Sequence, residues 1–280
     1  MAANPAVQTT NRQPMSVRIT TLGPPPLCLF FVVRQPMHTT RIHVDSPLTV
    51  SMELPLIGQA AEHISRVLRL LPGDAITLFN GDGCDYHSLI LAANKRGVSV
   101  RVESAHPVDN ESPLALTLAQ GVARGEKMDW IVQKATELGV VRIVPLVTER
   151  SEVRLDMERA QKRLARWRTV AISACEQSGR ARVPRLDPAL PLEAWLDQLT
   201  ADDGLRVSLL PNAHKSIRTL QFATPAGVLV IGPEGGLGDR DIRALRAANF
   251  DDVCLGPRIL RTETAGLAAL AALQAVHGDG

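Results

Sequence analysis

The chain has 280 residues, of which 45% are hydrophobic and 3% aromatic, and its formal net charge is +2. This composition is typical of a globular protein with one large or two ordinary domains, and it excludes a disordered chain. Because the net charge is small, a nucleic-acid partner must be bound by a local basic patch, and scarce aromatic residues argue against extended base stacking.

The beginning of the chain carries an apolar run, LCLFFVV at 27–33, that is too short to span a membrane. Prolines precede it and RQPM follows it, which is not the pattern of a secretory signal peptide. We interpret residues 1–36 as a poorly ordered tail or a mis-assigned start, because Met37 leads into RIHVDSPL. The four cysteines form no CxxC pair, so we expect the reduced thiols of a cytoplasmic protein.

Residues 37–108 are rich in predicted strands. AITLF at 75–79 is followed by NGDG and a second apolar-rich run, and NKRG leads into a third. Such glycine-containing turns predict β-hairpins. Apolar residues spaced i, i+3, i+4 and i+7 from Ile64 to Leu71 predict one helix before them. We therefore expect a small β-barrel with one helix, followed by a polar linker at 106–113.

From Leu114 onward, predicted strands and helices alternate. Strands are expected at LALTLAQ, VRIVPLV, LRVSLLP, GVLVIGPEGG and DDVCLG. Helices are expected from Met128 to Leu138, from Asp156 to Gln177, over DRDIRALRAANF, and from Ala265 onward. This alternation predicts an α/β domain with a parallel sheet over residues 113–280.

Three of these strands end in loops of small residues, namely LLP at 209–211, GPEGG at 232–236 and LGPRILRTETA at 255–265. Ligands of open α/β sheets bind beyond the carboxyl ends of strands, and glycine lets the backbone approach a ligand closely. Neither GxGxxG nor GxxxxGK[ST] is present, so these are not dinucleotide or P-loop signatures. Each loop alone is equally compatible with a purely structural role.

Basic residues are concentrated between 154 and 185, where nine Lys or Arg accompany three acidic residues. Most of them are expected to form a solvated helix face. The cluster ACEQSGR differs, because Glu176, Gln177 and Arg180 come together at a helix end where RNA contacts are plausible. Arg124 and Lys127 similarly stand at the start of a helix, where the helix dipole favours phosphate.

The segments RGEKMDWIVQKATELGV, ACEQSGR, IGPEGG and LGPRILRTETA occur in this order and at these spacings. Together they resemble the bacterial 16S ribosomal RNA uracil-N3 methyltransferases of the SPOUT superfamily, over about residues 37–280. The resemblance implies an α/β fold in which a PUA-like β-barrel precedes a SPOUT domain with a deep trefoil knot. It also implies a homodimer that uses S-adenosylmethionine, without a metal, on 16S rRNA of the small ribosomal subunit.

The same resemblance implies that the three loops bind the cofactor. Its expected contacts are Leu210, Pro211, Gly232, Pro233, Glu234, Gly235, Gly236, Leu255, Gly256, Ile259, Leu260, Arg261, Thr262, Thr264 and Ala265. Pro211 follows Leu210 where relatives often have His-Pro, so the contact at 210 departs from the family's pattern.

Methyl transfer to uracil N3 requires a positioned base that loses its imide proton. A cation would stabilise the developing imidate, and Arg261 and Arg124 are candidates for that role. Glu263 either accepts the proton or has a structural role, in orienting the loop or in the first turn of the last helix. The residues expected to contact RNA are Arg41, Arg66, Arg69, Lys127, Glu176, Gln177 and Arg180.

Two other functions fit parts of the sequence. A SPOUT ribose 2′-O-methyltransferase acting on rRNA or tRNA would share the fold and the glycine loop, but we would expect an Asn-Val-Ser type motif where this chain has RTETA. A non-catalytic RNA-binding module would need only the barrel and the basic patch. Three intact cofactor loops argue against it.

Overall fold

The structure, a computed structural model, describes residues 40–279 except 95–96, 153–156 and 201–202. The predicted tail at 1–36 lies outside the described residues, as do residues 37–39. Within the described ranges, no helix is long and apolar enough to cross a lipid bilayer.

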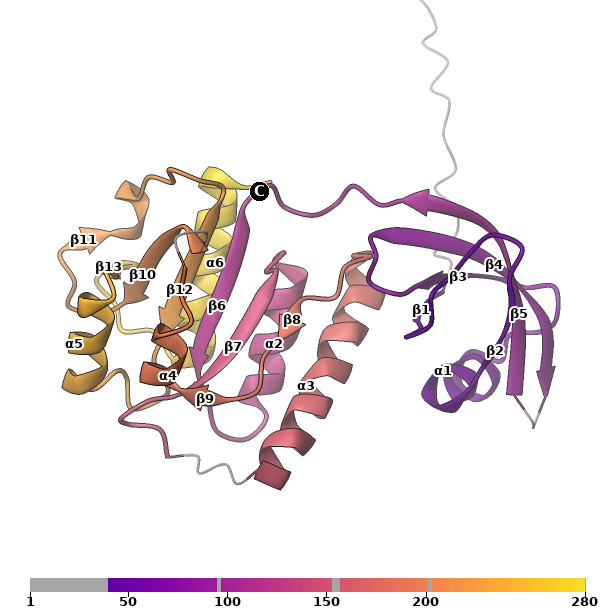
Figure 1. The fold of residues 1–280 in the computed structure, drawn as a ribbon, viewed down its shortest axis with the longest axis horizontal. Helices are drawn as coiled ribbons and strands as arrows, with labels where there is room; N and C mark the ends of the chain where they lie inside the picture. Colours follow the sequence, from indigo (N-terminus) through magenta and orange to yellow (C-terminus); the bar gives the residue numbers. More distant parts are fainter. Residues whose placement is uncertain (1–39, 95–96, 153–156, 201–202, 280) are drawn as a thin grey trace, which may run out of the picture. The chain divides into compact units, whose positions relative to one another are not determined.

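The N-terminal part of the described chain is a five-stranded sheet (Figure 1). Its strands are β1 (Arg41–His43), β2 (Glu53–Leu56), β3 (Ala75–Phe79), β4 (Cys84–Asn94) and β5 (Gly97–Pro107). They lie in the order β1-β3-β4-β5-β2, and all pairs except β1–β3 are antiparallel. Both predicted hairpins are confirmed, although β5 runs two residues into the expected linker. Within the described residues, β1 and β2 are the two edges of this sheet and do not pair with each other to close a barrel.

The predicted bounds of the helix from Ile64 to Leu71 are wrong at both ends. Helix α1 (Gly58–Glu62) continues as a π-helical turn, His63–Leu68, and Arg69 then adopts a left-handed φ of 55°. Ile64 is fully buried, whereas Val67 and Leu71 are each 67% exposed. The i, i+3, i+4, i+7 pattern therefore does not form one buried helix face, because the π turn and the left-handed residue rotate its second half outward.

The C-terminal part is an eight-stranded sheet in which every pair is parallel, as predicted. Its strands are β6 (Ala115–Gly121), β7 (Arg142–Val147), β8 (Arg185–Leu186), β9 (Leu190–Pro191), β10 (Leu205–Leu209), β11 (Lys215–Ser216), β12 (Ala226–Ile231) and β13 (Asp251–Cys254). The order is β11-β13-β10-β12-β6-β7-β8, with β9 also beside β7. The trefoil knot implied by the resemblance stays a prediction.

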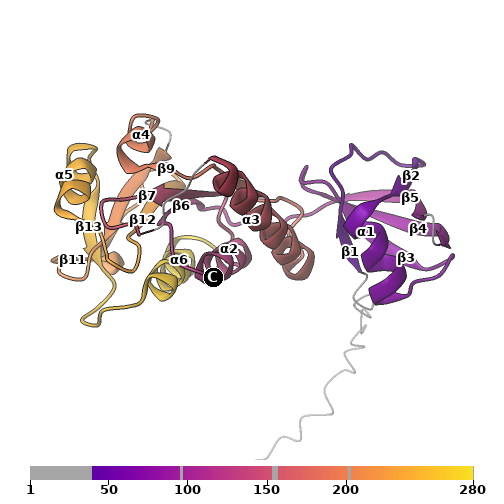
Figure 2. The same ribbon diagram turned by 90° about the horizontal axis from the view of Figure 1, so that it is seen from below.

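Helices cover both faces of this sheet (Figure 2). They are α2 (Lys127–Glu137), α3 (Met157–Ser178), α4 (Leu192–Leu196), the 3₁₀ turn η3 (Ile217–Thr219), α5 (Asp239–Ala247) and α6 (Thr262–His277). Successive strand residues point to opposite faces. Thus Leu118 and Leu229 pack in one core with α2, α3 and α6, while Ala119 and Val230 pack in another with α4 and α5. The last helix begins three residues earlier than the predicted Ala265.

Candidate active site

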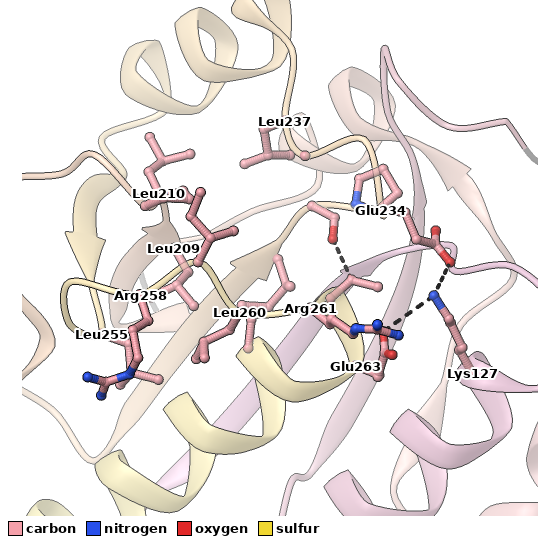
Figure 3. Close-up of a pocket in the computed structure, with 18 of the residues that line it drawn as sticks. Lys127, Leu209, Leu210, Glu234, Leu237, Leu255, Arg258, Leu260, Arg261 and Glu263 are labelled. Atoms are coloured by element: carbon pink, nitrogen blue, oxygen red, sulfur yellow. Dashed lines mark hydrogen bonds and ion pairs between the residues drawn. The ribbon is translucent and has the colours of Figure 1, made fainter.

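The loops that follow β10, β12 and β13 meet at the carboxyl edge of the sheet and enclose a cavity of about 450 Å³ (Figure 3). This volume is in the range of cofactor and small-ligand sites. The start of α2 and the start of α6 complete the walls. The lining residues are Lys127, Leu209, Leu210, Pro211, Ile231, Gly232, Pro233, Glu234, Gly236, Leu237, Leu255, Gly256, Arg258, Ile259, Leu260, Arg261, Thr262, Glu263 and Ala265.

The loop after β12 is a tight turn fixed to its neighbours. A Cβ atom on Gly232 would lie 2.8 Å from the carbonyl carbon of Gly236, so only glycine fits at this approach. Gly236 has a φ of 71° and donates its N–H to the carbonyl of Pro233 at 2.9 Å. Thr262 donates its hydroxyl to the carbonyl of Gly232 at 2.6 Å, and buried Gln120 donates to that hydroxyl at 2.9 Å. The turn is thereby tied to α6 and to β6.

One end of the cavity is lined mainly by leucines, with Arg258 beside Leu255, and the other end holds the remaining charged groups (Figure 3). Leucines from the three loops form the apolar wall, which suits a flat heterocycle packed between aliphatic side chains: Leu209, Leu210, Leu237, Leu255 and Leu260. The charged end holds Lys127, Glu234, Arg261 and Glu263. A ligand with both an apolar ring and a polar tail fits this division.

Lys127 lies between two carboxylates at the charged end. Its ammonium is 3.0 Å from Glu234 and 3.6 Å from Glu263 (Figure 3). Glu234 also accepts the backbone N–H of Arg124 at 3.0 Å. Burial by itself would raise the pKa of Glu234, but the N–H of Arg124, its own N–H and the Lys127 ammonium together hold that pKa below its usual value.

The two arginines predicted to act as cations lie differently. Arg261 is exposed, faces the cavity, and its side chain has no hydrogen-bond or ion-pair partner among the described residues. The side chain of Arg124 instead pairs with Glu152 and does not line the cavity. Arg124 thus contributes its backbone N–H to the site, and of the two guanidinium groups only that of Arg261 lines the cavity.

Two of the predicted cofactor contacts do not line the cavity. The carbonyl of Gly235 accepts a hydrogen bond from Arg150 at 3.1 Å, so this glycine faces the loop after β7. Thr264 is exposed on the outer side of α6. The other thirteen predicted contacts line the cavity, and so does Glu263.

Sequence reasoning missed Leu209, Ile231, Leu237 and Arg258, which also line the cavity. Each of them lies inside or next to one of the three predicted loops. A prediction that included the last residue of every strand, where side chains reach the sheet edge, would have found Leu209 and Ile231.

Two of the residues predicted to contact RNA, Arg180 and Arg41, have side chains that are bound within the protein instead. Arg180 is 4% exposed and donates to Glu111 and to the carbonyls of Thr136 and Val140. Arg41 pairs with Asp85 and donates to the carbonyl of Arg180 at 3.1 Å. Both guanidinium groups are engaged within the protein, so neither presents a free face to a phosphate.

The remaining RNA candidates outside the cavity are accessible in different degrees. Arg66, Arg69 and Gln177 are exposed. Glu176 is half-buried and accepts the backbone N–H of His43 at 3.1 Å, and burial raises the pKa of its carboxyl group. Among the described residues, no group of three or more His, Cys, Asp or Glu side chains could hold a metal ion.

Comparison with known proteins gives consistent matches over most of the chain. A family model described as an RNA methyltransferase domain matches residues 110–274, and one described as an RNA methyltransferase PUA domain matches residues 56–103. A curated relative from Bacillus subtilis, named ribosomal RNA small subunit methyltransferase E, is 33% identical and covers 78% of this chain and 88% of its own length. A relative of the same name from Buchnera aphidicola subsp. Schizaphis graminum is 31% identical and covers 85% and 97%.

Two solved structures are similar over 86% of this chain and 99% of their own chains. One, from Legionella pneumophila in complex with bound S-adenosylmethionine, has a TM-score of 0.83 and 39% identity. The other, a ribosomal RNA small subunit methyltransferase E from Neisseria gonorrhoeae bound to S-adenosylmethionine, has a TM-score of 0.81 and 38% identity.

Proposed function

The chain belongs to the RNA methyltransferase family whose curated members are named ribosomal RNA small subunit methyltransferase E, and we propose that it methylates N3 of a specific uridine in 16S rRNA with S-adenosylmethionine. The observation that carries this proposal is the cavity at the carboxyl edge of the parallel sheet. Its apolar wall and its charged end match the two halves of the cofactor, and Arg261 lines the charged end.

The residues that line the cavity fit the cofactor chemically. The leucine wall suits the adenine ring, and the backbone of the turn at 232–236 suits hydrogen bonds to polar groups of the ligand. Glu234 and Glu263 supply negative charge that would offset the positive sulfonium and amino groups of the methionine half. S-adenosylmethionine supplies an electrophilic methyl group on a sulfonium; the protein supplies position and charge.

The acceptor nitrogen of uracil is nucleophilic only as an imidate, so the protein must favour that anion. Arg261 is placed to stabilise the negative charge that develops on the base, since its guanidinium faces the cavity and is not neutralised by a carboxylate in the described residues. The turn after β12 and the start of α6 would hold the cofactor and the base in line. Such positioning lowers the activation barrier, because fewer arrangements of the reactants must be searched.

RNA is bound outside the cavity through phosphates. Exposed Arg66 and Arg69 on the N-terminal sheet's helical segment, and Gln177 at the end of α3, are the described candidates. We place the reaction in the cytoplasm, on 16S rRNA of the small subunit, and we assign the protein a homodimeric state.

The proposal is tested by incubating the purified protein with tritium-labelled S-adenosylmethionine and small subunits that lack the modification, then identifying the labelled nucleoside by mass spectrometry. We expect 3-methyluridine as the labelled product. A 2′-O-methylated nucleoside would identify a ribose methyltransferase instead. Absence of cofactor binding in calorimetry would identify a non-catalytic RNA-binding module.

A further inference from the structure

Three charged side chains from three separate elements meet at the cavity. Lys127 is the first residue of α2, Glu234 lies in the turn after β12, and Glu263 lies in the first turn of α6. The lysine ammonium is within 3.0 Å of Glu234 and 3.6 Å of Glu263. The contact joins residues that are more than a hundred positions apart in the sequence, so the tertiary fold brings them together.

The two carboxylates differ in the hydrogen bonds that their oxygens accept. Oε1 of Glu234 accepts hydrogen bonds from the Lys127 ammonium and from the Arg124 N–H. Oε2 of Glu263 is buried and accepts no hydrogen bond in the described residues, because Lys127 lies too far away for one. A buried acceptor without a donor is unfavourable, and the positive charge of Lys127 at 3.6 Å partly offsets that cost.

Lys127 is held in place by the carboxylates. Moving its ammonium to an RNA phosphate would leave Glu234 and Glu263 without their shared cation, and two carboxylates at one site repel each other. The other charged groups at the cavity are Arg261, at the start of α6, and Arg258, which lies with Leu255 at the opposite end (Figure 3). Lys127 is therefore the cation that the structure provides for Glu263.

Resting on the proposed function, we propose that Glu263 is the base that accepts the N3 proton of uracil, and that Lys127 is a positioning residue that holds this carboxylate at the charged end of the cavity. The N3–H bond breaks and its proton goes to the carboxylate of Glu263. The electron pair left on N3 forms the new bond to the methyl carbon, and the carbon–sulfur bond breaks with its electrons going to sulfur. The proton then passes from Glu263 to water.

The test measures single-turnover methyl transfer against pH, at saturating cofactor. Glu263→Gln is expected to slow transfer on the order of 10²–10⁴-fold, the usual worth of a general base. The difference in rate between Glu263→Gln and wild type should become smaller at high pH, because uracil N3 then loses its proton to the solvent without a protein base. Lys127→Gln is expected to lower the single-turnover rate without changing the dissociation constant of the cofactor, because the ammonium no longer holds the Glu263 carboxylate in place. Lys127→Arg should restore most of the wild-type profile.

Lys134→Gln is the matched control, because Lys134 also pairs with a carboxylate on α2, Glu137 at 2.8 Å, and does not line the cavity. It should keep the wild-type profile. In the Glu263→Gln background, Lys127→Gln should have no further effect on the rate, since the two residues act through one carboxylate.

A single-turnover rate of Lys127→Gln equal to that of wild type, rate losses that multiply in the double variant, or Glu263→Gln activity within threefold of wild type would each overturn the inference. Loss of cofactor binding by Lys127→Gln in calorimetry would also overturn it, by making Lys127 a cofactor contact. A wild-type protein that forms no 3-methyluridine contradicts the proposed function instead, so the two failures are distinguishable.

Discussion

The role of each arginine in this protein follows from what neutralises it. Arg180 is buried and its guanidinium is satisfied by Glu111 and by two backbone carbonyls. Arg124 pairs with Glu152 outside the cavity. Arg261 faces the cavity with no carboxylate paired to it in the described part of the chain, and a cation in that condition can give its full charge to a substrate.

We expect Arg261→Ala to slow methyl transfer by about 10²–10³-fold while leaving the fold and cofactor affinity nearly unchanged, because the guanidinium acts on charge that develops only during the reaction. The measurement is transfer of tritiated methyl to small subunits, with calorimetry for the cofactor. Arg243→Ala, at an exposed position of α5, is the control. Full activity of Arg261→Ala would refute the assigned role.

The thiol of Cys175 should be unreactive in the folded protein. Burial raises its pKa to about 12, and the thiolate is the reactive form. We expect iodoacetamide at pH 8 to leave Cys175 unmodified in the native protein and to alkylate it after denaturation, as read by peptide mass spectrometry. Equal rates in both states would show that this side chain is accessible.

Arg180 also shows how single side chains join elements. It stands just after α3 and contacts the end of α2, Val140 in the turn between α2 and β7, and Glu111 in the segment that precedes β6. Four such contacts from one buried guanidinium fix the relative positions of segments that the backbone alone does not connect. The sequence-based RNA assignment failed here because a basic cluster has the same appearance whether its members face solvent or a buried carboxylate.

Arg180→Ala is expected to reduce the free energy of unfolding by about 3–5 kcal/mol, because it leaves Glu111 and two carbonyls without their donor. Urea denaturation measures the loss. Gln177→Ala, at an exposed position on the neighbouring turn of α3, should change stability by no more than about 0.5 kcal/mol. A loss below about 1 kcal/mol for Arg180→Ala would contradict the structural role.

The long strands of the parallel sheet were predictable because their apolar runs are continuous, and the long helices because their apolar residues recur with the helical period. β6, β7 and β12 are apolar along nearly their whole length, as expected of strands covered on both faces. Strands β8, β9 and β11 have two residues each, which is too short for any pattern. The π-helical turn was likewise invisible, because its apolar spacing is that of an ordinary helix.

The loops that form the site could be predicted from the sequence, but the ion pairs between its charged side chains could not. The three strand-end loops were identified from glycine, proline and chain position, and they do enclose one cavity. The ion pairs of Lys127 depend on how α2, the turn after β12 and α6 pack together. No local pattern encodes that packing, so Lys127 was assigned to RNA and its place between Glu234 and Glu263 was missed.

For the molecule as a whole, we predict that removing residues 1–36 changes neither cofactor affinity nor methyl transfer. Every residue of the cavity lies between Lys127 and Ala265, and the described chain begins its first strand at Arg41. Calorimetry and the methyl-transfer assay on the truncated and full-length proteins provide the comparison. A clear loss of either property would make the segment part of the functional protein.

The central claim is methylation of uracil N3, and site-resolved analysis of 16S rRNA tests it most directly. N3 methylation blocks base pairing, so reverse transcriptase stops at the modified uridine, and mass spectrometry identifies the nucleoside. We predict 3-methyluridine at one position in the parent strain, an unmodified uridine after deletion of the gene, restoration by the wild-type protein, and no restoration by Arg261→Ala. An unchanged 3-methyluridine in the deletion strain, or loss of a ribose methyl group instead, would contradict the account.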